Sequence, residues 1–328
     1  MVYHSFFLEV NTLTQQDNIP INLEEQINWM KKYVNFRQNK KMREYLKCVG
    51  YFRASRYGKY LLSHTMQLGR KPDHNLLFNL YRLDMELRKL FFEYCQYIEI
   101  QTRTYISDFI SLELNNELFY LDVNSYTPSK SEKSKIKKQK NQRYFPTMFN
   151  DLLEREKEIR KNQKKYPELA EYRKGGIRTN QKLPCWVYFS YADFGNICLM
   201  YSYLNMKYKK IVLDKGYIGR THSKTDVEQY VTWLDAIKNL RNICCHHNIL
   251  IGRTSSIVLE DRIDNGLLLS NSDLFSRVYA LNKLLHDKER TEFKVALSKI
   301  LLRSKVDWEL LEILPSDWES KYDKIHKL

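Results

Sequence analysis

Apolar residues recur at every third or fourth position along most of this chain, the spacing that places them on one face of an α-helix. The longest such pattern runs from about Asn75 to Leu114 and contains no glycine or proline. A second long pattern begins at Thr225 and continues to about Ile251. We therefore predict that two long helices support the fold.

Shorter segments with the same spacing lie on both sides of these two patterns. They predict helices over residues 21–36, 42–49, 147–163, 185–208, 273–287, 289–304 and 306–314. Gly50 is placed to end the second of these helices, and Pro184 to open the fourth, because each residue favours that position. Residues 255–270 alternate between apolar and polar side chains around the turn sequence Asp264-Asn265-Gly266. This alternation predicts a small β-hairpin.

The scarcity of turn residues points to the same fold class. Ten glycines and seven prolines in 328 residues are too few for a β-sandwich or barrel, which needs turn residues about every 8–12 positions. We predict an all-α protein that carries, at most, the one hairpin. Its expected parts are an N-terminal helical region (1–74), a helical core (75–254), and a C-terminal hairpin with helices (255–328).

Two acid–base pairs lie four residues apart on the first long helix. They are Asp84 with Arg88, and Glu99 with Arg103. Such pairs contribute only about 0.2–0.5 kcal/mol at a helix surface. We expect a structural role at the surface for both.

Charge is concentrated in one segment. The formal net charge is +15, and residues 128–182 hold 17 Lys or Arg against seven Asp or Glu, which accounts for +10 of it. A loop over 129–141 and a flexible linker over 174–182 are expected here. An RNA backbone would fit this segment, although a solvated charged surface is the alternative. The expected RNA-binding residues are Lys135, Lys137, Lys138, Lys140, Arg143, Lys174 and Arg178.

A second candidate for RNA contact mixes aromatic and basic side chains directly after Gly50. Tyr51, Arg53, Arg56 and Tyr57 could stack on bases and bind phosphates. The alternative is the start of a helix, with the aromatic rings in a core and the arginines in water.

Cysteine spacing and the N-terminus bear on location. The six cysteines show no metal-binding spacing, Cys244 and Cys245 are adjacent, and a reducing cytosol fits them best. The first residues lack the basic and apolar regions of a signal peptide, and no apolar run reaches the roughly 18 residues of a membrane-spanning helix. We expect a cytoplasmic protein with no metal, no cofactor and no membrane contact.

A candidate catalytic pattern lies on the helix expected over 225–251, and the alternative is that its polar side chains are simply exposed to solvent. On a helical wheel with Arg241 at 0°, an apolar stripe falls at about 260–340°. It consists of Tyr230, Trp233, Ile237, Leu240, Cys244 and Ile251. Asn242 and His246 fall away from this stripe, Arg241 lies at its margin, and His247 lies at the edge of the core face. We therefore expect an outward Arg241, Asn242 and His246, and a buried His247 as a secondary candidate.

These groups suit the cleavage of RNA without a metal. A base must remove the proton of the 2′-hydroxyl, a cation must stabilise the charge on the phosphorane, and an acid must protonate the leaving 5′-oxygen. Histidine exchanges protons near neutral pH, and arginine offers phosphate a charged fork. Because one helix supplies one well-placed histidine, two copies meeting across a twofold axis would supply both proton-transfer groups. The pattern thus predicts a homodimer.

Several motifs in one order resemble the Abi-like abortive-infection proteins of bacteria (the AbiD and AbiF group), in the HEPN ribonuclease superfamily. The motifs are Leu46-x3-Gly50-Tyr-Phe-Arg53, Tyr81-x2-Asp84-x2-Leu87-Arg88, Ile98-Glu99-x3-Arg103, Leu183-Pro-x-Trp186 with Phe194-Gly195, and Trp233-Leu-x5-Leu240-Arg-Asn-x-Cys-x-His246-His247.

This resemblance implies an all-α HEPN-type helical bundle and a dimeric endoribonuclease site at Arg241 and His246, assisted by Asn242. It also implies a role in antiviral defence or as the toxin of a toxin–antitoxin pair, in some relatives restrained by a structured non-coding RNA. Two alternatives stay open. One is an RNA-binding HEPN protein that does not cleave, and the other is a helical subunit whose basic surface meets an acidic protein.

Overall fold

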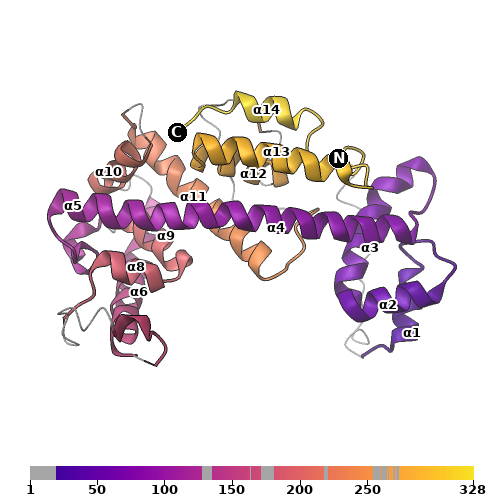
Figure 1. The fold of residues 1–328 in the computed structure, drawn as a ribbon, viewed down its shortest axis with the longest axis horizontal. Helices are drawn as coiled ribbons and strands as arrows, with labels where there is room; N and C mark the ends of the chain where they lie inside the picture. The colour runs from indigo at the N-terminus through magenta and orange to yellow at the C-terminus, as the bar shows by residue number, and fades with distance from the viewer. Residues whose placement is uncertain are drawn as a thin grey trace. The chain divides into compact units, whose positions relative to one another are not determined.

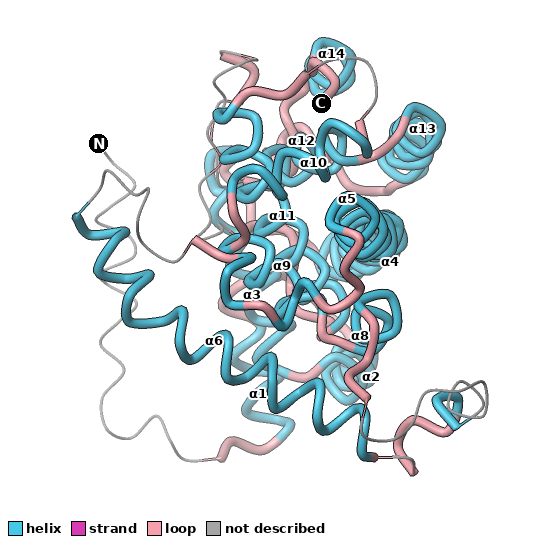
Figure 2. Tube along the Cα trace, turned by 90° about the vertical axis from the view of Figure 1, so that its left-hand side faces the viewer, coloured by secondary structure: helices cyan, strands magenta, loops and turns pink. Residues whose placement is uncertain are grey.

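The computed structural model describes residues 20–127, 135–162, 164–170, 181–217, 221–253 and 273–328, and residues 259, 264, 266–268 and 270, with the backbone alone at 67 and 135–143. Throughout these residues the protein is α-helical with short 3₁₀ and π turns and no β-strand, which confirms the predicted all-α fold (Figures 1 and 2). Most of the hairpin predicted over 255–270 lies outside the described residues, and the described positions within it form no strand.

The chain divides into two compact units. The first is residues 1–83 with 304–312, and the second is residues 84–303 with 313–328. The boundary falls inside helix α4 (His74–Thr104), which contributes its first ten residues to the first unit.

The described part of the first unit packs three short helices and the start of α4. The three are α1 (Leu23–Met30), α2 (Asn39–Val49) and α3 (Tyr51–Thr65). Asn22 and Glu25 cap α1 reciprocally, and Gly50 joins α2 to α3 with a φ of 81°, which glycine adopts without strain. The buried side chains of the unit include Ile27, Met30, Met42, Leu46, Ala54, Tyr57, Leu61, Leu77 and Leu80.

The second unit contains the rest of α4 and the other helices. A π turn at Tyr105–Phe109 follows α4 directly. The helices after it are α5 (Ile110–Leu114), α6 (Lys135–Lys161), α8 (Cys185–Tyr191), α9 (Phe194–Tyr203), α10 (Met206–Gly216), α11 (Lys224–Cys245), α12 (Leu274–Leu284), α13 (Asp287–Arg303) and α14 (Trp318–Lys324). Helix α11 packs against α9, α10 and α12, and α6 packs against α8 and α9. The second predicted long helix is thus central to this unit.

Tertiary contacts override several predicted boundaries. The single helix expected over 185–208 is three, because the chain becomes extended at Ala192 and again at Leu204. At the second break, the Asn205 amide and the Tyr203 carbonyl bond the backbone of residues 125–127 instead of continuing a helix. The loop expected over 129–141 was wrong from Lys135 onward, where α6 already runs.

The predicted C-terminal helix is also in the wrong place. Residues 306–314 form turns, with Glu312 at a left-handed φ of 50°, and the helix comes later, as α14. Helices α12 and α13 lie within three residues of their predicted bounds.

Gly216, the last residue of α10, marks a close approach to the π turn that follows α4. A Cβ atom at this position would lie 2.5 Å from the ring of Tyr105. By contrast, a Cβ at Gly195 in α9 would meet the Lys238 side chain at 3.8 Å, an ordinary contact distance. Of these two glycines, Gly216 is therefore the one that packing requires.

We predict that Gly216→Ala lowers the free energy of unfolding by about 1–3 kcal/mol, because the new methyl group overlaps the Tyr105 ring. The matched change Gly195→Ala should leave it unchanged or raise it by about 0.5–1 kcal/mol, because alanine favours the helix. Urea unfolding followed by circular dichroism measures both. Equal effects of the two substitutions would contradict the close approach at Gly216.

Candidate functional site

Helix α11 is fixed at its start and along one face. Ser223 and Asp226 form a capping box at its N-terminus. The predicted apolar stripe is confirmed within the helix, since its side chains are all buried from Tyr230 to Cys244. The Cys95 thiol of α4 approaches the Ile237 carbonyl at 3.9 Å. The orientation of α11 is therefore set by its core face, which leaves the opposite face for chemistry.

The end of α11 differs from the sequence prediction. The helix was expected to reach about Ile251, but it ends at Cys245, with His246 as its C-cap. His247 then adopts a left-handed φ of 53° and is exposed, so its predicted burial was wrong. The apolar residues after it are buried in a non-helical turn, and this is why the helical spacing appeared to continue.

A buried ion pair on α4 holds this turn. Asp84 Oδ1 accepts hydrogen bonds from the amides of Leu250 (2.9 Å) and Ile251 (2.7 Å). Arg88 Nη1 donates to the carbonyls of His247 (2.7 Å) and Asn248 (3.1 Å). The two side chains also pair with each other, with 3.2 Å between Arg88 Nε and Asp84 Oδ2. The structural role predicted for this pair is confirmed, but its predicted surface position was wrong.

Arg241 lies between two polar partners. Its Nε is 3.3 Å from Glu99 Oε2 on α4, and its Nη1 donates to Asn242 Oδ1 at 3.3 Å. The Arg241 side chain is 30% exposed, and Asn242 and His246 are both exposed. Asn242 and His246 face outward as expected, whereas Arg241 is half-buried, with its Nε atom against Glu99. The catalytic role of the three residues stays a prediction. Sequence reasoning missed the contact between Glu99 and Arg241, because 142 positions separate them.

Two buried cysteines near this site, Cys95 and Cys244, are not poised for chemistry. Burial, followed by the charge of Asp84, raises the pKa of the Cys244 thiol to about 12. Burial is also the largest of the causes that raise the pKa of Cys95 well above its usual value. Both thiols are therefore protonated at neutral pH, and thiolate chemistry is not expected from either.

The stretch after Gly50 forms the first two turns of α3 and requires one correction. Tyr57 is 1% exposed and packs in the core of the first unit, so it cannot stack on a base. Tyr51 is half-buried against the ring of Trp29. Arg53 is half-buried as well, and Arg56 is exposed.

The exposed ring of this stretch is Phe52, which sequence reasoning passed over. Its side chain is 76% exposed, and the Arg56 guanidinium lies 5.9 Å from its ring centre. Helical spacing could have found it, because positions 54, 57, 58 and 61 share the opposite, buried face.

The basic segment is only partly described. Lys135, Lys137, Lys138, Lys140 and Arg143 lie in the first turns of α6, whereas Lys174 and Arg178 fall outside the described residues. Farther along α6, the buried Glu156 binds Arg160 (2.8 Å) and accepts from the Leu183 amide (3.1 Å). This carboxylate ties the helix to the chain before α8.

Metal and membrane features are absent from the part of the chain that the structure describes. No group of three or more His, Cys, Asp or Glu residues there is arranged to hold a metal ion. None of its helices combines the length and the apolar surface needed to cross a bilayer.

We predict that Asp84→Asn lowers the free energy of unfolding by about 3–5 kcal/mol, because it leaves Arg88 as a buried charge without its counter-ion. The control is Asp235→Asn on α11, where the Asp235–Lys238 pair is partly exposed to solvent and contributes about 0–1 kcal/mol. Urea unfolding compares the two variants. A loss at Asp84 no larger than that at Asp235 would contradict the clamp on the turn after α11.

The family comparison covers the site just described. The family model for Abi-like proteins matches residues 44–252, well over half of the chain, and this range contains Phe52, both α4 ion pairs and the end of α11. No curated protein and no solved structure matches the chain. The match nevertheless suffices to assign the family, and the chain belongs to the Abi-like proteins.

Proposed function

We propose that this protein is a metal-independent endoribonuclease of abortive-infection defence, built on a HEPN-type bundle. The observation that carries the proposal is the end of α11, where exposed His246 follows half-exposed Arg241 by five positions on a backbone clamped by Asp84 and Arg88. Phosphodiester transfer needs proton-transfer groups and a group that stabilises the charge on the phosphorane, and a histidine and an arginine can supply them.

The reaction we propose is attack by the RNA's own 2′-hydroxyl. One His246 removes the 2′-hydroxyl proton as the 2′-oxygen bonds to phosphorus, and Arg241 stabilises the charge on the phosphorane. The bond from phosphorus to the 5′-oxygen then breaks, and an acid protonates that oxygen. The products are a 2′,3′-cyclic phosphate and a 5′-hydroxyl. Asn242, which bonds the Arg241 guanidinium at 3.3 Å, would help to hold it.

Because the reaction moves two protons, we propose that the active form is a homodimer. A second copy would bring its own His246 to the composite site, so that one histidine acts as the base and the other as the acid. A structured non-coding RNA is proposed to restrain this site until infection, and the surfaces that could hold such an RNA are basic.

Two surfaces favour RNA as the partner. One is the basic start of α6, within the +10 segment 128–182. The other is the first unit, where residues 20–83 hold thirteen Lys or Arg and only four Asp or Glu. There, exposed Phe52 lies under Arg56, and Lys32 Nζ lies 5.0 Å from the ring of Trp29. Exposed rings beside cations are typical of surfaces that bind single-stranded nucleic acid. They also support the alternative of an RNA-binding protein that does not cleave.

His246→Ala should reduce cleavage of labelled total RNA in EDTA by about 10²- to 10⁴-fold, because it removes the proton-transfer group. The control is His247→Asn, since asparagine tolerates the left-handed backbone at that exposed position. It should cleave like the wild type. Equal cleavage by the wild type and His246→Ala would reject this active site, and no cleavage by any of the three would leave RNA binding as the better account.

Phe52→Ala should weaken the binding of a fluorescein-labelled 20-uridine RNA by about tenfold, because it removes one stacking ring. Fluorescence anisotropy measures this in the His246→Ala background, in which the probe stays intact. The matched control is Leu302→Ala on α13, which removes an equally exposed apolar side chain. Unchanged affinity after Phe52→Ala would exclude this ring from RNA binding.

A further inference from the structure

Glu99 on α4 joins two arginines from different parts of the second unit. Its Oε2 lies 3.3 Å from Arg241 Nε, and its Oε1 accepts a hydrogen bond of 2.5 Å from Arg103 Nη2. The Glu99 side chain is only 13% exposed, so the surrounding protein shields both contacts from solvent. The carboxylate is therefore held between the two guanidinium groups.

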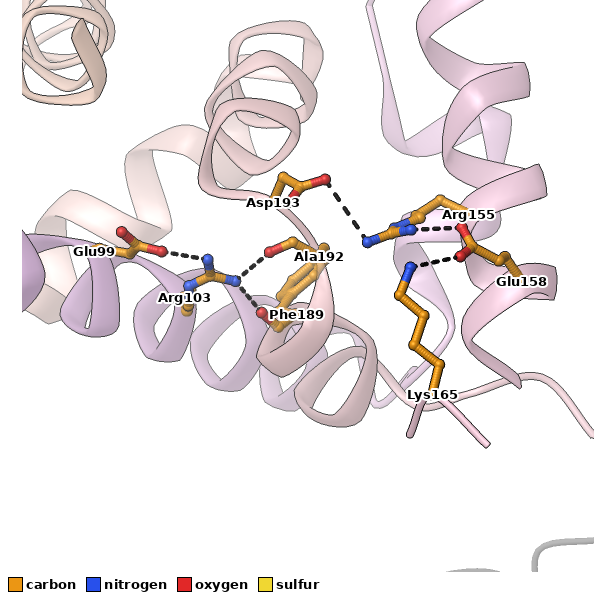
Figure 3. A network of polar contacts seen from close by, with 8 residues as sticks. All are labelled: Glu99, Arg103, Arg155, Glu158, Lys165, Phe189, Ala192 and Asp193. Atoms are coloured by element: carbon orange, nitrogen blue, oxygen red, sulfur yellow. Dashed lines mark hydrogen bonds and ion pairs between the residues drawn. The ribbon is translucent and has the colours of Figure 1, made fainter. Parts of the chain in front are cut away.

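The second of these arginines is itself anchored. Arg103 Nη1 donates to the carbonyl of Ala192 at 2.6 Å and to that of Phe189, at the C-terminal end of α8 (Figure 3). A cation is favoured at the C-terminal end of a helix, where the last carbonyls lack partners. Asp193, the next residue, lies 3.8 Å from Arg155 of α6 (Figure 3). The position of Glu99 is thus fixed by the packing of α4 against α8 as well as by its own helix.

This anchoring constrains Arg241. Two contacts restrict the guanidinium before any ligand arrives. Its buried Nε forms an ion pair with Glu99 that lacks hydrogen-bond geometry, and its Nη1 donates a hydrogen bond to Asn242. A long arginine side chain without such partners would sample many rotamers, and fixing it during the reaction would cost entropy. A catalytic group held in advance by supporting contacts avoids that cost.

We infer that Glu99 is the positioning residue of the proposed active site, presenting Arg241 to the phosphate rather than exchanging protons with the RNA. This inference rests on the proposed function. Glu99 Oε1 accepts a hydrogen bond from Arg103, its Oε2 forms the ion pair with Arg241, and its side chain is mostly covered. The residue acts through Arg241, so its loss should affect the orientation of the cation and leave the proton-transfer groups in place.

The kinetic test is Glu99→Gln, which keeps the size of the side chain and removes its charge. The control is Glu93→Gln, an exposed acid on the same helix. The substrate is a labelled oligonucleotide containing a site that the wild type cuts in total RNA. Glu99→Gln should lower kcat by about 100-fold, with KM and the shape of the pH–rate profile close to wild type, since misplacing a catalytic group costs about that much. Glu93→Gln should behave like the wild type.

Two kinetic outcomes would overturn the inference. A kcat equal to that of the wild type would show that Arg241 needs no support from Glu99. Loss of one limb of the pH–rate profile in Glu99→Gln would make Glu99 itself an acid or base instead of a positioning residue.

A second readout does not depend on cleavage. In protein labelled with ¹⁵N-arginine, the Nε–Hε NMR signal of Arg241 is identified by its disappearance in Arg241→Lys. This signal should shift in Glu99→Gln and stay in place in Glu93→Gln. The signals of arginines other than Arg103, which also binds Glu99, confirm that both variants are folded. An unshifted signal would disprove the contact. If the wild type cleaves no RNA, the proposed function is rejected. The NMR spectrum still tests whether Glu99 contacts Arg241.

Discussion

One buried ion pair holds the turn that follows α11. The geometry of the candidate site depends on that turn. Asp84 and Arg88 lie one turn apart on α4, and together they bind two amides and two carbonyls of the turn that follows α11. Burying either charge alone would cost several kcal/mol, so the pair is stable only with its counter-ion and hydrogen bonds in place. These bonds also satisfy backbone groups of the turn itself, where no helical ladder can pair them. The same contacts that stabilise the fold therefore fix the backbone that carries His246.

Helix α4 contributes to the site in two ways. Asp84 and Arg88 hold backbone, whereas Glu99, three turns farther along the same helix, holds a side chain. Both sets of contacts pair buried or half-buried charges next to α11. Because the apolar face of α11 packs in the core, its polar residues lie on the opposite face. Folding thus places an arginine and a histidine at the end of α11, which is the arrangement that supports the proposed RNA cleavage.

The sequence was sufficient to predict the helical fold class, the long α4 helix and the buried stripe of α11, because these depend on local spacing. It could not locate the end of α11, since Ile249, Leu250 and Ile251 are buried whether the chain is helical or turned. The Asp84–Arg88 spacing looks the same at a surface as in a core, so its burial was missed. The breaks at Ala192 and Leu204, and the contact between Glu99 and Arg241, arise from tertiary partners far away in the chain. Such partners leave no periodic signal in the residues themselves.

The chemistry of the RNA ends tests the account most directly. RNA fragments produced by the purified protein in EDTA can be identified by mass spectrometry of their termini. Attack by the 2′-hydroxyl, with His246 and Arg241 as the reacting groups, predicts 2′,3′-cyclic phosphates and 5′-hydroxyls. Fragments ending in 3′-hydroxyls and 5′-phosphates would contradict this account, because they require attack by water on the phosphate.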